Sequence, residues 1–271
     1  MSGRVVTSLA NATVKAVRAL HLKKARDETG LFVAEGLKIV TEAVELGYAP
    51  AMLLYGREAA DHPLLARAAA ATEAARGEVL EVTSDILAKV ARRDNPQAVV
   101  GVFRQRFKDL QDLDPASASC WVALHRVRDP GNLGTIIRTL DAAGGGGLIL
   151  VGECCDPYSV EAVRATMGSI FAVPLARADE AAFAAWRKAW PGTVVGTLLS
   201  ASASHRTADY RAPVMILMGN EQQGLPSQMA DLCDVNVKIP MRGRADSLNL
   251  AVATGIMIYS ATEAGEKGAH T

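Results

Sequence analysis

Residues 238–249 read Lys238-Ile239-Pro240-Met241-Arg242-Gly243-Arg244-Ala245-Asp246-Ser247-Leu248-Asn249, and an apolar stretch follows from Leu250 to Tyr259. The proline and the glycine predict a turn that joins the end of a strand to the start of a long helix. Ser247 or Asp246 can cap that helix, and N–H groups of its first turn that stay uncapped suit a carboxylate or another anion. Apolar residues at helical spacing predict the face that packs against a core, namely Leu248, Val252, Ile256 and Tyr259.

Length and composition restrict the class of protein. A chain of 271 residues suits two domains. Its formal net charge is zero, which argues against a uniformly polybasic nucleic-acid-binding protein. No apolar run approaches the roughly 20 residues of a membrane-spanning helix, and residues 1–10 lack the apolar centre of a secretory signal. We therefore expect a cytoplasmic protein without a membrane segment.

The four cysteines show no CxxC spacing, which argues against a zinc site and against a disulfide framework. We expect buried free thiols at all four positions, which are Cys120, Cys154, Cys155 and Cys233.

The first part of the chain alternates short apolar segments with helical patterns and predicts a small α/β domain over residues 1–107. The expected helices are residues 11–22, 37–46, 64–75 and 86–91, and the expected strands are residues 31–34, 51–54, 79–82 and 98–103. Residues 108–119 are polar, contain proline and serine and lack periodicity, so they are predicted to link two domains.

The alternation is stronger in residues 120–271. The expected strands are residues 121–124, 148–151, 171–173, 193–198, 214–218 and 235–239. The expected helices are residues 134–143, 160–166, 180–190 and 227–232, together with the closing helix. Short apolar strands between helices predict a mostly parallel sheet covered by helices on both faces. Ligands of such sheets bind outside the carboxyl ends of the strands.

Three loops lie at predicted strand ends, and the stretch quoted above is the third. In the first, residues 126–138, a proline and glycines force a turn, and Asn132 can cap the following helix. The second, residues 218–226, places a carboxylate and amides between two glycines and predicts a binding loop. Its spacing differs from that of a phosphate-binding P-loop. The glycine run Gly144–Gly147 precedes a strand, which argues against a dinucleotide-binding turn.

Arg138 is the candidate catalytic cation of the first loop. It lies one turn into the predicted helix, where an arginine can hold a phosphate or assist the deprotonation of a nearby hydroxyl. A surface arginine paired with Asp141 remains an alternative. His125 is the histidine nearest to this loop, and we expect no catalytic role for it.

Together the loops resemble the three ordered motifs of the SpoU (SPOUT-superfamily) RNA 2′-O-ribose methyltransferases. The motifs are Asn132-x-Gly134-x-x-x-Arg138, then Gly219-Asn220-Glu221-x-x-Gly224-Leu225, then Ile239-Pro240-Met241-x-Gly243 with Ser247-Leu248-Asn249. Residues 163–169 also look like that family. The N-terminal part is similar to its RNA-substrate-binding domain at Asn11, Lys15, Lys24, Arg26 and Phe32 to Gly36. The resemblance covers nearly the whole chain, and three motifs in order are specific although each alone is weak.

The resemblance implies a C-terminal domain tied in a trefoil knot, which periodicity alone would not predict because knots are nearly absent from proteins. It implies that the methyl donor S-adenosylmethionine binds in the knot, against Thr197, Gly219, Ile239 and Leu248. It implies that Arg138 activates the ribose 2′-hydroxyl in a site shaped by Asn132, Glu221, Ser247 and Asn249. The family works as a homodimer through its knot helices, which suits the small residues Ala251, Ala253 and Gly255.

The resemblance also gives a role to two basic clusters, whose arginines and lysines become candidate RNA-phosphate contacts. These are Lys15, Arg18, Lys24, Arg26, Arg92 and Arg93. Ribosomal RNA is the expected substrate, with transfer RNA second, and a sulfonium donor requires no metal. One alternative is a non-catalytic RNA-binding or ribosome-assembly protein of the same fold. A nucleotide-cofactor dehydrogenase is disfavoured by the missing phosphate-binding turn.

Overall fold

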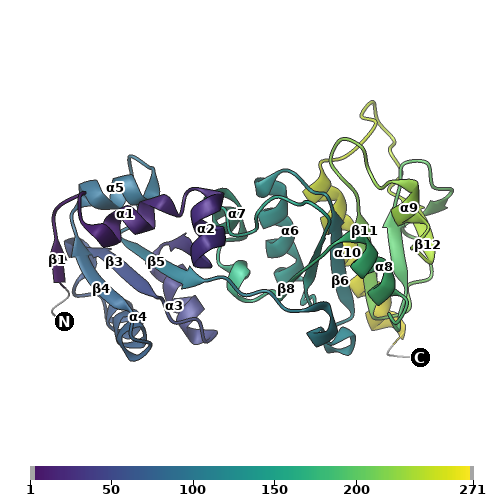
Figure 1. The fold of residues 1–271 in the computed structure, drawn as a ribbon. Helices are drawn as coiled ribbons and strands as arrows, with labels where there is room; N and C mark the ends of the chain where they lie inside the picture. The colour runs from purple at the N-terminus through teal and green to yellow at the C-terminus, as the bar shows by residue number, and fades with distance from the viewer. Residues whose placement is uncertain (1–3, 269–271) are drawn as a thin grey trace. The chain divides into compact units, whose positions relative to one another are not determined.

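The computed structural model describes residues 4–268. The chain forms two compact units (Figure 1). The N-terminal unit holds the chain up to Gln105 together with Asp156–Phe171, and the C-terminal unit holds Arg106–Cys155 together with the chain from Ala172 onward. Among the described residues, no helix is both long enough and apolar enough to span a bilayer.

The N-terminal unit contains a five-stranded sheet in the order β1-β4-β3-β5-β2. Its strands are β1 (Arg4–Val6), β2 (Leu31–Glu35), β3 (Met52–Gly56), β4 (Glu78–Val82) and β5 (Val99–Arg104). The pairs β1–β4 and β3–β4 are parallel, and β5 pairs antiparallel with both β2 and β3. The predicted strands of this part are confirmed, with β1 in addition.

Helices cover both faces of this sheet (Figure 1). They are α1 (Ala12–Ala19), α2 (Lys23–Thr29), α3 (Leu37–Glu45), α4 (Pro63–Ala74) and α5 (Ser84–Ala91). The predicted helix 11–22 ends early, and α2 follows as a separate helix that the sequence analysis did not predict. Asn11 caps α1 by accepting from Thr13 N and Val14 N. Buried valines, leucines and isoleucines of α1 and α5 form one core with the sheet.

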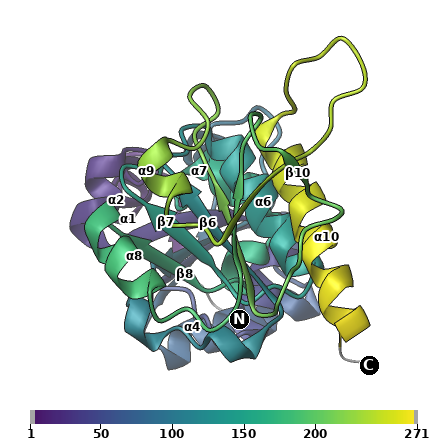
Figure 2. The same cartoon turned by 90° about the vertical axis from the view of Figure 1, so that its right-hand side faces the viewer.

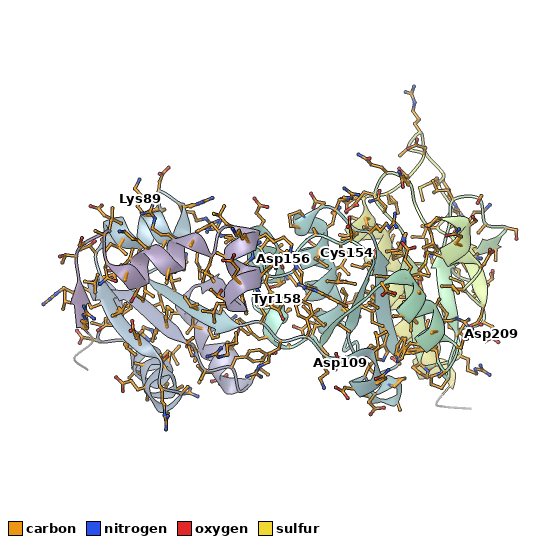
Figure 3. All side chains as sticks on the ribbon, in the orientation of Figure 1. Lys89, Asp109, Cys154, Asp156, Tyr158 and Asp209 are labelled. Carbon is orange, nitrogen blue, oxygen red and sulfur yellow. The ribbon has the colours of Figure 1, made fainter. Side chains whose placement is uncertain are left out.

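The segment Asp156–Phe171 belongs to the N-terminal unit, which division at a single linker did not predict. It contains α7 (Val160–Thr166) and the short 3-10 helix η4 (Ser169–Phe171). The Phe171 ring packs 4.7 Å from the Phe103 ring, and Tyr158 lies 4.6 Å from Phe32, measured between centroids. Asp156, shown with Tyr158 in Figure 3, forms a buried ion pair with Arg26 over 2.8 Å. These contacts make the returning segment part of the N-terminal core.

The C-terminal unit is built on a parallel sheet of seven strands in the order β10-β12-β9-β11-β6-β7-β8. The strands are β6 (Cys120–His125), β7 (Leu148–Val151), β8 (Leu175–Ala178), β9 (Val194–Thr197), β10 (Ala203–Ser204), β11 (Val214–Met218) and β12 (Val235–Lys238). The predicted parallel sheet is confirmed. The predicted strand 171–173 is wrong, because Phe171 is used in the N-terminal core and the strand begins only after Pro174.

Helices α6 (Pro130–Ala142) and α10 (Leu250–Gly268) lie against one face of this sheet, and α8 (Glu180–Arg187) and α9 (Ser227–Ala230) against the other (Figure 2). Two caps differ from prediction. Asp129, not Asn132, caps α6 by accepting from Asn132 N over 2.6 Å. Asn249, not Ser247 or Asp246, accepts from the first N–H groups of α10.

The predicted linker 108–119 is folded onto the C-terminal unit. Lys108 N donates to Leu175 O, and Leu113 is 7% exposed within the core. Trp121 Nε1 donates to Pro115 O over 3.2 Å. Its lack of periodicity reflects two short 3-10 helices, η2 (Leu110–Asp112) and η3 (Pro115–Ser117), which carry neither a helix nor a strand pattern.

The exposed face of α10 corrects the predicted core face. Val252 is 52% exposed and Tyr259 is 46% exposed, while Thr254, Met257 and Ile258 of the same helix are buried. Of the small residues, Ala251 is buried and Gly255 lies close to Thr139 of α6 within the same chain. The apolar stripe predicted to pack inside the unit therefore faces solvent.

Candidate active site

The loops after β9, β11 and β12 line one cavity of 530 Å³ at the carboxyl ends of these strands. All four residues predicted to line a donor site, Thr197, Gly219, Ile239 and Leu248, line this cavity. Glu221 and Ser247, which were predicted to shape the catalytic site, also line it. Figure 2 shows the long connection from β12 to α10 extending beyond the body of the unit.

The loop after β11 closes tightly on itself. Asn220 N donates to Gly224 O, and Gly224 N donates back to Asn220 O. The Asn220 Oδ1 atom accepts from Gln222 N and Gln223 N, which fixes the turn between them. A Cβ atom on Gly219 would lie 2.0 Å from the carbonyl carbon of Gly224, so only glycine fits at this position. The glycines of the motif therefore set the shape of one cavity wall.

Glu221 joins the second loop to the first. Its carboxylate accepts from Arg128 N over 3.1 Å and from Asp129 N over 3.0 Å. Asn132 Nδ2 also approaches Glu221 Oε1, at 3.4 Å. Because several N–H groups converge on one carboxylate, the Glu221 side chain is held in place at the start of α6.

A further amide joins the third loop to this network. Asn249 Nδ2 donates to Asn132 Oδ1 over 2.9 Å, while Asn249 Oδ1 caps α10. The chain Glu221–Asn132–Asn249 therefore connects residues from all three motifs, although they lie far apart in the sequence. Each amide uses both its donor and its acceptor, which fixes its orientation.

The cavity suits a ligand with both apolar and polar parts. Its lining includes Leu198, Leu199, Leu225 and Ile239, which offer an apolar wall. Thr197 Oγ1 is buried there and has no hydrogen-bond partner in the described part of the chain. An unpartnered buried hydroxyl is costly unless a ligand satisfies it. The residues present therefore fit a molecule that combines a flat apolar ring with hydrogen-bonding groups, as an adenosine does.

Arg138 and Ser247 are less closely tied to this network. Arg138 is exposed on α6 and does not line the cavity of its own chain. It forms no ion pair with any described residue, so the predicted alternative of a pair with Asp141 is not observed. Ser247 Oγ donates to its neighbour Asp246 over 3.3 Å.

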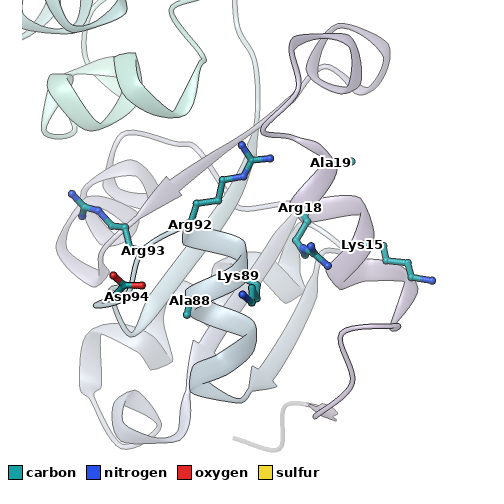
Figure 4. Close-up of a pocket in the computed structure, with 8 residues that line it drawn as sticks. All are labelled: Lys15, Arg18, Ala19, Ala88, Lys89, Arg92, Arg93 and Asp94. Atoms are coloured by element: carbon teal, nitrogen blue, oxygen red, sulfur yellow. The ribbon is translucent and has the colours of Figure 1, made fainter.

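Four of the predicted RNA contacts line one groove of the N-terminal unit (Figure 4). Lys15 and Arg18 extend from α1, and Arg92 and Arg93 follow α5. Lys89 joins them, and the only acidic residue of the 470 Å³ groove is Asp94. All five cationic side chains are exposed, and none forms an ion pair with a described residue. The groove thus concentrates positive charge that the neutral whole chain does not reveal.

Two predicted RNA contacts lie elsewhere. Lys24 is exposed on α2, 3.8 Å from Glu28. Arg26 is 4% exposed, donates to Asp156 and to Leu20 O, and is therefore unavailable to RNA in this fold. The prediction for Arg26 is corrected, because its charge compensates a carboxylate that the sequence places 130 residues away.

The sequence analysis also missed a charged cluster beside the first loop. His125 is buried, and its Nε2 atom lies 2.8 Å from Glu180 Oε1. Arg126 Nε approaches the same oxygen at 2.8 Å. The hydrogen bond with His125 lowers the pKa of Glu180. No sequence signal joined Glu180 to this loop, because the contact depends on β8 pairing beside β7.

The cysteines are free in the structure. Burial raises the pKa of Cys120 to about 12 and does the same for Cys233, and it raises the pKa of Cys154. No group of three or more potential metal-binding side chains occurs among the described residues.

Comparison with known proteins identifies similar chains over both units. A profile of the SpoU rRNA Methylase family matches residues 119–259, and a profile of an MRM3-like substrate binding domain matches residues 11–101. The crystal structure of an AdoMet-bound rRNA methyltransferase from Sinorhizobium meliloti is 53% identical, with a TM-score of 0.90, over 96% of this chain and 97% of that chain.

Two curated proteins are also similar over most of their length. A 23S rRNA (uridine(2479)-2′-O)-methyltransferase from Streptomyces viridochromogenes is 32% identical over 87% of this chain and 84% of that protein. The 23S rRNA (guanosine(2553)-2′-O)-methyltransferase RlmP from Bacillus subtilis is 30% identical over 94% of this chain and 97% of that protein.

Proposed function

The chain belongs to the SpoU rRNA methylase family, and on that premise we propose how this RNA 2′-O-ribose methyltransferase arranges its substrates. It uses S-adenosylmethionine and has the trefoil-knotted fold of that family. The proposed substrate is ribosomal RNA, since the curated relatives above are named as 23S rRNA methyltransferases. Transfer RNA is the less favoured substrate.

One observation carries the proposed site. Three loops that are distant in sequence line one cavity, and Glu221, Asn132 and Asn249 connect them through hydrogen bonds. We assign the cavity to the methyl donor. Thr197 would hydrogen-bond it, Gly219 would give its backbone close access, and Ile239 and Leu248 would cover its adenine.

The chemistry assigns different tasks to the donor and to the protein. The donor supplies an electrophilic methyl group on a sulfonium, which is a good leaving group. A ribose hydroxyl is a weak nucleophile near neutral pH and must lose its proton as the O–CH₃ bond forms. We assign to Arg138 the stabilisation of the developing oxyanion, directly or through a phosphate of the RNA, because a guanidinium stays protonated and is a poor general base.

We propose that the active form is a homodimer built on α10. Its exposed stripe, Val252, Ile256 and Tyr259, offers an apolar face that a second copy would cover. Arg138 lies on the neighbouring helix α6 and outside its own cavity. In the proposed dimer, Arg138 would act in the site of the partner copy. Action on ribosomal RNA also favours a cytoplasmic location.

The groove of Figure 4 is proposed to bind phosphates of the same RNA. Five exposed cations around one hollow can contact several phosphates, and such contacts set register and affinity rather than base specificity. This assigns substrate capture to the N-terminal unit and methyl transfer to the C-terminal unit.

The direct test is methyl transfer by the purified protein. We expect incorporation of labelled methyl groups into ribosomal RNA from cells that lack the protein, and a single 2′-O-methylated nucleotide after mapping. RNA from cells that contain the protein should accept far less label. Binding of both donor and RNA without any transfer would instead support the non-catalytic RNA-binding alternative.

A further inference from the structure

A second cavity lies on the other side of the loop that lines the proposed donor site. It has a volume of 540 Å³, and the residues Asn220, Glu221, Gln222 and Gln223 line both cavities. Its remaining wall comes from the loop between β6 and α6 and consists of Arg126, Arg128 and Asp129. One loop therefore separates the two cavities.

The carboxylates of this second cavity are already engaged. Asp129 Oδ1 accepts from Asn132 N and caps α6, while Glu221 accepts from the backbone of Arg128 and Asp129. The Arg128 side chain, in contrast, is exposed and forms no ion pair within the described residues. The negative charges thus serve the fold, and a guanidinium remains free to bind an anion.

Arg126 is held more rigidly. Its backbone adopts the left-handed conformation, with φ of 51°, which is uncommon for a residue other than glycine. Arg126 N donates to Val151 O, and Asn220 Nδ2 donates to Arg126 O over 2.7 Å. Glu180, itself bound to His125, holds Arg126 Nε. The Arg126 side chain is still 54% exposed, so its terminal amino groups remain accessible.

We propose that Arg126 and Arg128 form a subsite for a backbone phosphate of the RNA strand whose ribose is methylated. This inference rests on the proposed function. A strand that presents a ribose to the donor cavity must continue past the loop that bounds it, and the second cavity lies there. A guanidinium fork matches the oxygens of a phosphate, and Arg126 is pre-oriented for such a contact. The subsite would position the acceptor nucleotide without reading its base.

The test measures RNA binding and methyl transfer by Arg128→Ala. The substitution keeps the backbone N–H that Glu221 accepts, and Arg128 does not line the donor cavity, so S-adenosylmethionine affinity should stay unchanged. For ribosomal RNA from cells lacking the protein, we expect KM to rise about tenfold, the effect of one charge-assisted contact. The slope of log affinity against log salt should become shallower by about 0.7 to 0.9, as for one lost phosphate.

Arg211→Ala is the matched control. Arg211 is also exposed but precedes β11, at the opposite edge of the same sheet, where its carbonyl accepts from Thr193 N. Equal salt slopes and KM values for the two variants would overturn the subsite. A wild-type protein that binds RNA but transfers no methyl group would instead overturn the proposed function, and the salt slope would still test the role of Arg128.

Discussion

Arg138 is the side chain on which the proposed chemistry depends, and its own chain leaves it exposed and without an ion pair among the described residues. If it acts in the partner copy of a homodimer, two inactive variants should restore each other. We expect Arg138→Ala and Glu221→Gln to lose most transfer separately. A mixture of the two, unfolded and refolded together, should regain part of the wild-type rate, because some mixed dimers contain one intact site. A mixture no more active than its components would place Arg138 in its own site or outside catalysis.

The buried thiols predict a dependence of stability on alkaline pH. An unfolded cysteine ionises near pH 8.5, whereas burial raises the pKa of Cys120 to about 12. Above about pH 8.5 the folded state therefore holds the extra proton, and the free energy of unfolding falls as pH rises, by up to about 1.4 kcal/mol per pH unit for this thiol. Urea unfolding between pH 8 and pH 10 should show a shallower decline for Cys120→Ala than for the wild type. Parallel declines would contradict the assignment.

At the scale of elements, helix α10 has two apolar faces with different roles. One face packs against β6, β11 and α6, and the other exposes Val252 and Tyr259. We expect Tyr259→Asp to shift the protein from dimer to monomer in sedimentation velocity, because a carboxylate would be buried without a partner in the proposed interface. Leu46→Asp changes a similarly exposed apolar residue on the N-terminal unit and should leave the mass unchanged. A monomeric wild type would refute the dimer.

The pair between α2 and the returning segment gives a second prediction at this scale. Replacing Arg26 with leucine leaves Asp156 buried without its cation, which typically costs about 3–5 kcal/mol of stability. We expect a large drop in the urea midpoint of the N-terminal unit. If folded Arg26→Leu protein has the wild-type salt dependence of RNA binding, Arg26 is structural. A shallower salt dependence would return it to the set of phosphate contacts.

Element prediction succeeded where one periodicity continued without interruption. The valine-rich strand β5 and the apolar strand β11 match their patterns, since burial on the sheet dictates nearly every residue. Prediction failed where residues serve a distant element. Phe171 follows a strand-like pattern but packs on Phe103, and the stripe of α10 has helical spacing but faces solvent. Pattern alone records that a face is apolar and does not record which surface covers it.

The candidate site could be predicted by motif but not by contact. The three loops were expected together, and Glu221, Asn132 and Asn249 do meet. Asp129 as the cap of α6 and the link from Glu180 to Arg126 were not foreseen. Both depend on the relative placement of strands, which a linear spacing does not contain.

At the scale of the whole molecule, charge is separated by position rather than by amount. The formal net charge is zero, yet the groove around Lys89 gathers five exposed cations. We expect the combined change Lys15→Ala, Arg18→Ala and Arg92→Ala to weaken RNA binding strongly and to flatten its salt dependence by about two to three phosphate contacts, at about 0.7 to 0.9 each. Donor binding should not change. A triple variant of lysines and arginines outside the groove, Lys38→Ala, Arg57→Ala and Arg67→Ala, controls for general charge; equal effects would remove the groove from RNA capture.

The chain crosses between its two units after Gln105, after Cys155 and after Phe171. The N-terminal unit is therefore not a transferable cassette. A chimaera that grafts residues 1–105 onto another catalytic domain would leave behind Asp156, Tyr158 and Phe171, and with them the counter-charge of Arg26 and the rings that cover Phe32 and Phe103. Retargeting such an enzyme to a new RNA requires exchange of the returning segment as well.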